Sequence, residues 1–148
     1  MFDRQLLVVV KPLQIRLAQR LLHSGITANQ VTIVGFIVGI MVIPLLAFEQ
    51  YGWALWVILL NRIFDGLDGT LARLSTPTDR GSFLDIVLDF LFYSAVPLGF
   101  ALANANQNAL AAAVLIYAFI GTGCSFLAFA TLAAKRELHS TDYPDKGF

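Results

Sequence analysis

The chain has 148 residues, of which 57% are hydrophobic and 14% are charged, and its mean hydropathy is +0.72. Soluble domains usually carry about 25% charged residues, so this composition excludes an ordinary soluble protein and indicates a membrane protein. Ten Lys and Arg residues balance ten Asp and Glu residues, which gives no support for nucleic-acid binding. A single cysteine, Cys124, excludes a disulfide within the chain.

The first predicted element is an amphipathic helix over residues 11–24. Leucines share one face of this helix and arginines lie on another: Leu13, Leu17, Leu21, Leu22, Arg16 and Arg20. Such a helix either lies on the membrane surface, with its basic face towards anionic headgroups, or packs on the bundle. The pattern leaves both alternatives open, and Gly25 is expected to end the helix.

Four apolar segments follow, each about 20 residues long and so able to cross the hydrocarbon core as a helix. They run approximately over 31–49, 52–73, 82–104 and 108–134. Thr27 and Gln30 have the spacing of a capping box, which predicts an abrupt start for the first span. We therefore predict an all-α, polytopic transmembrane helix bundle that forms one domain over residues 1–148, preceded by the juxtamembrane helix.

The basic residues fall on one side of this layout. They are Arg4, Lys11, Arg16, Arg20, Arg62, Arg73, Arg80, Lys135, Arg136 and Lys146. We predict that three of them cluster around the loop between the second and third spans: Arg62, Arg73 and Arg80. By the positive-inside rule, both termini and this loop face the cytoplasm. The small size and the lack of a recognisable targeting signal suit a bacterial inner membrane.

Two pairs of aspartates occupy the ends of the second and third spans. Asp65 and Asp68 are three residues apart, and Asp85 and Asp89 are four apart, so each pair shares a helix face. The short loop makes the two spans antiparallel, which brings the four carboxylates to similar depths. Burying four aspartates would cost on the order of 10 kcal/mol at the bilayer centre. A divalent cation would offset both this cost and the mutual repulsion.

The ligand set favours a hard cation. Carboxylate oxygens suit Mg²⁺ or Mn²⁺ better than Zn²⁺. Neither His23 nor His139 is close to the aspartates in sequence, and Cys124 lies on another span. The sequence therefore predicts a Mg²⁺ or Mn²⁺ site made by the four aspartates.

Glycines and an arginine accompany the aspartates. Three glycines lie within the predicted helical segments: Gly66, Gly69 and Gly81. Each makes its helix less stable than a residue of higher helix propensity would. They allow either close approach of a polar ligand or tight packing of helices, and packing is almost as good an explanation for Gly66. Arg73 can neutralise a phosphate or serve as an interfacial cation, whereas Arg80 fits the interfacial role better.

Together these residues resemble the signature of the CDP-alcohol phosphatidyltransferases, D-x-x-D-G-x-x-A-R followed by G-x-x-x-D-x-x-x-D. All fixed positions are filled, by Asp65, Asp68, Gly69, Ala72, Arg73, Gly81, Asp85 and Asp89. The gap over residues 74–80 is one residue shorter than is usual. The segment 26–32 is also similar to the one that opens the first span in this family.

The resemblance implies a phospholipid-synthesis enzyme that transfers a phosphatidyl-type group from CDP-diacylglycerol, or another CDP-alcohol, to an alcohol acceptor and releases CMP. It implies that Asp65, Asp68 and Asp85 hold one or two metal ions and that Asp89 is the general base, with a share in metal binding. Residues that would border the nucleotide and phosphates are Asn29, Thr32, Gly69, Ala72, Arg73 and Gly81. The acceptor stays open.

The family has six spans and is often dimeric, whereas four spans are predicted here and the chain is polar after Glu137. We expect a C-terminally incomplete chain that lacks the last two spans. Phe119, Phe126, Phe129, Gly121 and Gly123 are expected to make packing or dimer contacts. Two rival functions are a silent interaction subunit and an ion-coupled transporter, although acids of a transporter should lie near the midplane.

Overall fold

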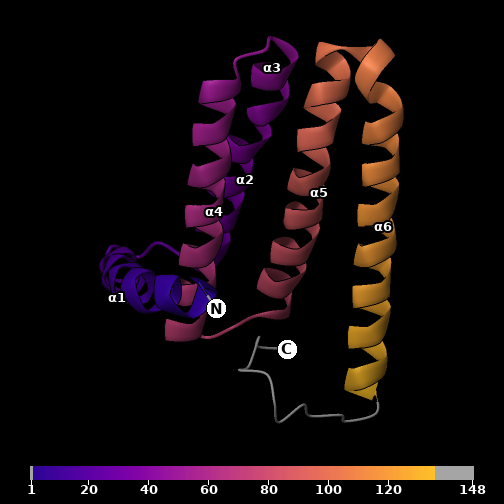
Figure 1. Cartoon of the computed structure of the whole chain (residues 1–148). Coiled ribbons are helices and arrows are strands. Elements are labelled where there is room, and N and C mark those ends of the chain that lie inside the picture. The colour runs from indigo at the N-terminus through magenta and orange to yellow at the C-terminus, as the bar shows by residue number, and fades with distance from the viewer. Residues whose placement is uncertain (1, 136–148) are drawn as a thin grey trace.

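The computed structural model describes the backbone of residues 2–135 and the side chains of residues 11–133 and 135. Within these residues it is entirely helical, which confirms the predicted all-α class (Figure 1). The helices are α1 (Phe2–His23), α2 (Ala28–Ile40), α3 (Val42–Ala47), α4 (Tyr51–Leu74), α5 (Asp79–Ala103) and α6 (Ala105–Lys135).

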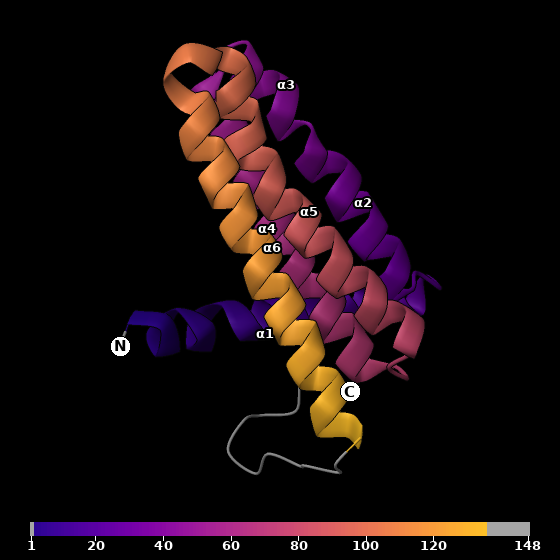
Figure 2. The ribbon, with the colours of Figure 1, turned by 90° about the vertical axis from the view of Figure 1, so that its right-hand side faces the viewer.

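Helices α2 to α6 run up and down the bundle, and α1 lies across its base (Figure 2). Helix α3 continues the direction of α2 after a break at Met41, where Pro44 lacks the N–H that would continue the helical hydrogen bonds. Both α4 and α5 pack against α2 and α3, and α6 packs on the outer side of α5. The short connection over residues 75–78 puts the C-terminal end of α4 and the N-terminal end of α5 at the same end of the bundle.

Three helical segments of the described chain are long and apolar enough to cross a membrane: Ala28–Ala47, Asp79–Ala103 and Ala105–Ala133. Together with the composition they define an integral membrane protein. Helix α4 has 24 residues, or about 36 Å of helix, and runs beside these segments. Its lower apolarity comes from Arg62, Asp65 and Asp68, which belong to the polar site described below.

The helix ends follow local chemistry. At the start of α2 the capping box of Thr27 and Gln30 is present, as predicted. Gly25 ends α1 with a φ of 76°, a left-handed conformation that glycine adopts without a Cβ clash. Helix α5 begins at Asp79, earlier than the predicted third span, because the Thr78 side chain accepts a hydrogen bond from the Gly81 N–H.

The core has two clusters, one at each end of the bundle. The cluster near α3 contains Val42, Leu46, Ala54, Phe92 and Ala95. The cluster near α1 contains Ala18, Val31, Leu67 and Leu71, with Leu21 and Leu22 packed against it. Thus α1 packs on the bundle through its C-terminal half. Leu13 and Leu17 on the same helix stay exposed, together with Arg16 and Arg20.

The predicted contact residues of α6 divide into two groups. The Phe119 ring lies 6.1 Å from the Tyr93 ring of α5, and a Cβ at Gly123 would lie 3.3 Å from the Phe90 ring. These two residues therefore pack inside the bundle. Phe129 is exposed, and Gly121 has open space around it. A dimer remains a prediction.

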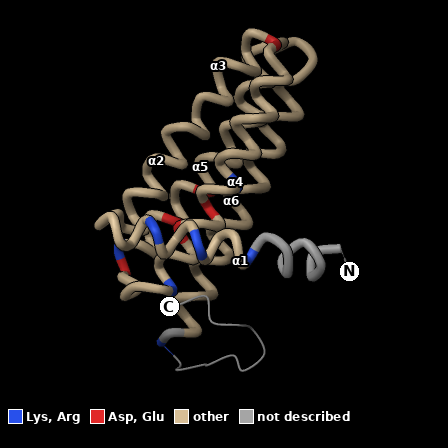
Figure 3. The backbone as a smooth tube through the Cα atoms, turned by 90° about the vertical axis from the view of Figure 1, so that its left-hand side faces the viewer, with Lys and Arg blue, Asp and Glu red and all other residues tan. Residues whose placement is uncertain are grey.

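Several expectations lie outside the described residues. They concern the side chain of Arg4, the residues Arg136, His139 and Lys146, and the polar segment after Glu137. Among the described residues, Lys and Arg gather towards the α1 end of the bundle, and the α3 end has none (Figure 3).

A close approach of α4 and α5 to Gly39 of α2 provides a test of the core packing. A Cβ at Gly39 would lie 2.6 Å from Asn61 Nδ2 and 2.9 Å from Phe92 Cδ2. We expect Gly39→Ala to destabilise the protein by roughly 1–3 kcal/mol, because the buried side chains of Asn61 and Phe92 must both shift. Thermal unfolding in detergent measures this effect. In the matched control, Gly121→Ala, the new methyl group meets nothing within 4 Å, so stability should be unchanged or should rise by up to about 1 kcal/mol. Equal effects of the two variants would contradict the packing described here.

Candidate active site

A pocket near the α1 end of the bundle contains all four predicted aspartates. It lies between α2, α4 and α5 and is lined by Thr32, Gly35, Phe36, Asn61, Phe64, Asp65, Asp68, Asp85, Leu88 and Asp89. The space at its centre is about 20 Å³, enough for one water molecule or one ion. A nucleotide is far larger, so any such ligand must lie mainly outside this space.

Three of the aspartates form a compact cluster. One carboxylate oxygen from each of Asp65, Asp68 and Asp85 lies within 4.8 Å of the other two. Asp68 is 4% exposed, and its buried Oδ1 has no hydrogen-bond partner. A buried carboxylate oxygen without a partner is costly unless a cation or donor satisfies it. The three aspartates therefore fit a hard divalent cation that prefers oxygen ligands.

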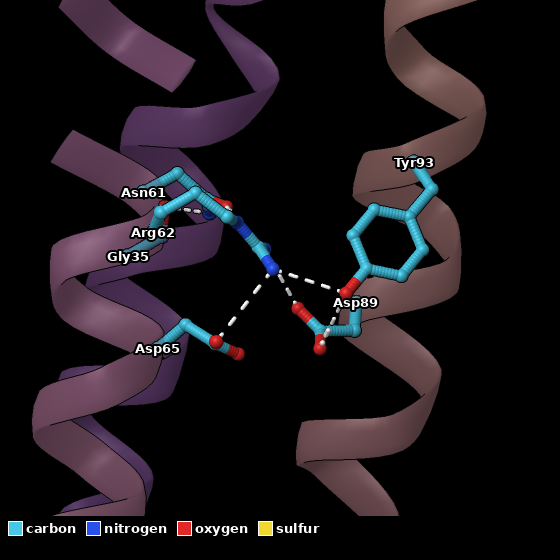
Figure 4. Close-up of polar contacts among 6 residues, drawn as sticks. All are labelled: Gly35, Asn61, Arg62, Asp65, Asp89 and Tyr93. Carbon is cyan, nitrogen blue, oxygen red and sulfur yellow. Dashed lines mark hydrogen bonds and ion pairs between the residues drawn. The ribbon is translucent and has the colours of Figure 1, made fainter. Parts of the chain in front are cut away.

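The fourth aspartate has a different set of partners (Figure 4). Arg62 Nη2 donates to Asp89 Oδ1 at 2.9 Å, and the Tyr93 hydroxyl donates to Asp89 Oδ2 at 3.1 Å. Arg62 also lies 3.6 Å from Asp65 Oδ2. Asp89 is thus held by a cation and a phenol, and the same cation also contacts Asp65 of the three-aspartate cluster.

The structure corrects the role we gave Arg62 from sequence, that of a cation in the loop cluster. Its guanidinium extends from α4 towards α5 and lies 5.0 Å from the centroids of both the Phe92 and Tyr93 rings. The positive-inside rule counts such a residue by sequence position and does not register its depth. The missed signal is the pair Asn61-Arg62, which interrupts an apolar run one helical turn before Asp65.

Asn61 fixes this arginine to the bundle. Its Oδ1 accepts from Arg62 Nη2 at 2.6 Å and from Nε at 3.1 Å, and its Nδ2 donates to the Gly35 carbonyl at 3.0 Å. Asn61 is itself buried. The absence of a side chain at Gly39 leaves room for this amide, as the 2.6 Å Cβ distance shows. Helix α2 therefore supports the arginine through Asn61.

The predicted nucleotide-binding residues fall into separate groups, and of these residues only Thr32 lines the pocket. Thr32 lines the pocket, with its hydroxyl donating to the Ala28 carbonyl at 3.1 Å. Asn29 and Gly81 meet across α2 and α5, since a Cβ at Gly81 would lie 2.8 Å from Asn29 Oδ1.

On α4, the exposed Arg73 donates from Nη2 to Thr70 Oγ1 at 3.2 Å. A Cβ at Gly69 would lie 3.5 Å from Arg73 Nη1. Ala72 is half-buried and does not line the pocket. The last turns of α4 thus carry a small-residue surface beside an exposed guanidinium.

Gly66 serves helix packing. A Cβ at this position would collide with Gln14 Nε2 of α1. The glycine therefore lets α1 cross close to α4, one residue away from Asp65. The sequence left two roles open for Gly66, close approach of a ligand and helix packing. The contact with α1 favours helix packing.

A polytopic helical membrane protein with clustered carboxylates at one end of its spans has the features of a metal-assisted enzyme acting at the membrane surface. Comparison with known proteins identifies the family. Residues 25–143 match the CDP-alcohol phosphatidyltransferase family. The chain belongs to this family, as the signature indicated, and family membership places it among the phosphatidyltransferase enzymes of phospholipid synthesis.

Three curated relatives are similar to the chain. Inner membrane protein YnjF of Escherichia coli (strain K12) is 54% identical over 148 residues, which cover 100% of this chain and 72% of the relative. Archaetidylinositol phosphate synthase of Pyrococcus horikoshii is 33% identical over 97 residues, or 65% of this chain and 51% of the relative. Phosphatidylcholine synthase of Legionella bozemanae is 36% identical over 61 residues, or 38% and 28%. No solved structure matches the chain.

The three-aspartate cluster predicts opposite effects of one substitution with and without metal. Asp68→Asn removes a negative charge from a crowded buried site, so we expect the metal-free variant to be at least as stable as the unsubstituted protein. Saturating Mn²⁺ should stabilise the unsubstituted protein by about 2.7 kcal/mol at a hundredfold excess over Kd. Asp68→Asn should lose most of this gain. Thermal unfolding in EDTA and in Mn²⁺ measures both effects.

Glu49→Gln is the matched control, because Glu49 follows α3 at the opposite end of the bundle. It should retain the full Mn²⁺ stabilisation. If Asp68→Asn and Glu49→Gln respond equally to Mn²⁺, the cluster is not a cation site.

Proposed function

We propose that the chain catalyses transfer of a phosphatidyl or related substituted phosphate group from CDP-diacylglycerol, or another CDP-alcohol, to an alcohol acceptor, with release of CMP and dependence on Mg²⁺ or Mn²⁺. The observation that carries the proposal is the cluster of Asp65, Asp68 and Asp85, whose oxygens lie within 4.8 Å of one another. Asp89 lines the same pocket. Membership of the chain in the CDP-alcohol phosphatidyltransferase family supports the proposal.

In the proposed reaction, the acceptor oxygen forms a bond to the lipid-side phosphorus and the bond from that phosphorus to the CMP oxygen breaks. Asp89 takes the proton of the acceptor hydroxyl. Asp65, Asp68 and Asp85 would hold the divalent cation, which when bound neutralises the charge that builds on the departing CMP. The bond electrons leave with CMP, so no oxidant or reductant is needed.

The donor is proposed to bind at the mouth of the pocket. Gly69 and Ala72 offer a small-residue surface on α4, and the exposed Arg73 can pair with a phosphate. Asn29, Thr32 and Gly81 would border the nucleotide from α2 and α5. The limited space among the aspartates supports this arrangement, because it admits an ion but not the nucleotide.

We propose that the α1 end of the bundle faces the cytoplasm of a bacterial cell, in the inner membrane. Lys and Arg of the described chain gather at this end (Figure 3), as the positive-inside rule requires of a cytoplasmic side. This orientation exposes the pocket to cytoplasmic alcohols and to CDP-linked lipids made on that side.

The direct test is CMP release from CDP-diacylglycerol in detergent, with a panel of alcohols and with Mg²⁺, Mn²⁺ or EDTA. We expect release with one acceptor, no release in EDTA, and a loss of at least about a hundredfold in Asp89→Asn, because general-base catalysis typically contributes that much. Asp79→Asn is the matched control on α5, an exposed aspartate in the first helical turn. It should retain activity.

Three other results separate the alternatives. CMP release that persists at full rate in Asp89→Asn would remove Asp89 from the mechanism. Metal-dependent binding of CDP-diacylglycerol without release for any alcohol would favour a silent interaction subunit. Absence of both binding and release would reject the transferase.

Gly69 offers a test of the donor site that leaves the fold intact. A new Cβ there would meet only Arg73, at 3.5 Å, which is an ordinary contact. We expect Gly69→Ala to raise KM for the donor at least several-fold while the unfolding temperature stays the same or rises. An unchanged KM would place the nucleotide elsewhere. Gly52→Ala, near the start of α4 at the opposite end of the bundle and also without neighbours within 4 Å, is the control.

A further inference from the structure

Helix α1 packs on the bundle with one face and leaves apolar side chains exposed on another. Ala18 is fully buried, and Leu21 and Leu22 pack beside it. Leu13 is 58% exposed and Leu17 is 37% exposed on the same helix. Because the bundle covers only the face around Ala18, the two exposed leucines are available to a further apolar partner.

Exposed arginines border these leucines. Arg16 and Arg20 are both exposed and lie one helical turn apart. At about 100° per residue, the two arginines and the two exposed leucines fall in one stripe along α1. Leu17 lies nearest to the packed face, and the arginines lie further round. Residues 11–23 contain no Asp or Glu, so the stripe combines apolar surface with positive charge.

The bilayer itself is the partner that fits this stripe. Helix α1 lies across the base of the bundle, at one end of the membrane-spanning helices (Figure 2). A helix in that position can bury leucines in the acyl boundary while its arginines reach the headgroup phosphates. Anionic headgroups favour such a site by about fivefold for each basic side chain. A second copy of the stripe carries the same positive charge, so charge complementarity favours an anionic lipid surface over self-association.

The packed face of α1 contacts the part of α4 that carries two of the clustered aspartates. Gln14 Nε2 occupies the space that a Cβ at Gly66 would need. Gly66 directly follows Asp65 in the sequence. One residue later, Leu67 packs in the same cluster as Ala18. An interaction that keeps α1 in place therefore also supports the turn of α4 next to the pocket.

We propose that the stripe of Leu13, Arg16, Leu17 and Arg20 binds anionic phospholipid, and that this binding holds α1 against α4 and raises activity at the aspartate pocket. The lipid-binding half does not depend on the proposed transferase function, whereas the regulatory half rests on it. Because coupling between two sites is reciprocal, order in α1 and in the adjoining part of α4 should rise together with the anionic lipid.

The lipid-binding half is tested with the full chain in nanodiscs. Leu17→Cys, in a Cys124→Ser background, carries an environment-sensitive fluorophore. The discs contain equal amounts of phosphatidylcholine and phosphatidylglycerol, and an acyl-chain spin label that quenches the fluorophore is attached to one lipid or the other. We expect labelled phosphatidylglycerol to quench several-fold more strongly than labelled phosphatidylcholine. High salt and the pair Arg16→Gln/Arg20→Gln should each remove most of this preference.

Two controls separate lipid selectivity from other effects. The pair Arg16→Lys/Arg20→Lys keeps both charges and should keep the preference. A fluorophore at Leu110→Cys lies on α6 at the α3 end, where the described residues include no Lys or Arg. Both labelled lipids should quench it equally. The unfolding temperature of each variant in detergent should match that of the unsubstituted chain, because the substituted side chains are exposed.

The regulatory half has two measurements. Hydrogen exchange of residues 13–24 and 62–72 should slow several-fold when phosphatidylglycerol replaces phosphatidylcholine in the discs. CMP release, measured at a constant fraction of CDP-diacylglycerol, should rise several-fold under the same replacement. Neither change should occur in Arg16→Gln/Arg20→Gln, and both should occur in the lysine pair.

Three results would contradict the proposal. Equal quenching by the two lipids at position 17 would overturn the lipid-binding half. Absence of quenching by either lipid would also overturn it, since protein would then cover the stripe. A lipid preference at position 17 without any change in the exchange of residues 62–72 would overturn the regulatory half. Quenching and exchange can be measured even if the chain releases no CMP, so failure of the transferase function and failure of this proposal remain distinguishable.

Discussion

The ion pair between Arg62 on α4 and Asp89 on α5 is the interaction on which the site depends. These helices pack against α2 and α3, and the arginine spans the space between them at the level of the pocket. A cation in an apolar bundle is stable only with carboxylate, amide and aromatic partners around it. Asn61, Phe92 and Tyr93 supply these partners, and Gly39 of α2 leaves room for Asn61. The packing of the helices and the placement of the charged side chains therefore depend on each other.

Much of this arrangement could be predicted from sequence because it follows from local periodicity. Apolar length predicted the helices, the spacing of Thr27 and Gln30 predicted the start of α2, and i,i+3 and i,i+4 spacing put the aspartates on facing surfaces. The charged residues of α4 lowered its apolarity without changing its helical course beside the spans. Local rules did not predict how α1 divides its leucines between the bundle and the exposed surface, since that division depends on tertiary packing.

The same rules failed for Arg62 for a physical reason. A count of basic residues near loops treats Arg62, Arg73 and Arg80 alike. Arg73 and Arg80 are exposed near the helix ends, whereas Arg62 lies three turns further into α4 and reaches aromatic rings of α5. The identity of its partners depends on the pairing of two antiparallel helices, and a single helix pattern does not contain that pairing.

Depth along those two helices also explains why the four aspartates are not equivalent. On α4, Arg62 lies about one turn deeper than Asp65; on α5, which runs the opposite way, Asp89 lies about one turn deeper than Asp85. Antiparallel packing therefore pairs the deeper arginine with the deeper aspartate and leaves Asp65, Asp68 and Asp85 together nearer the loop. Asp85 is exposed there while Asp68 is buried. A polar ligand entering from the loop end meets the three-aspartate cluster first, and Asp89 lies behind it between charged and aromatic side chains.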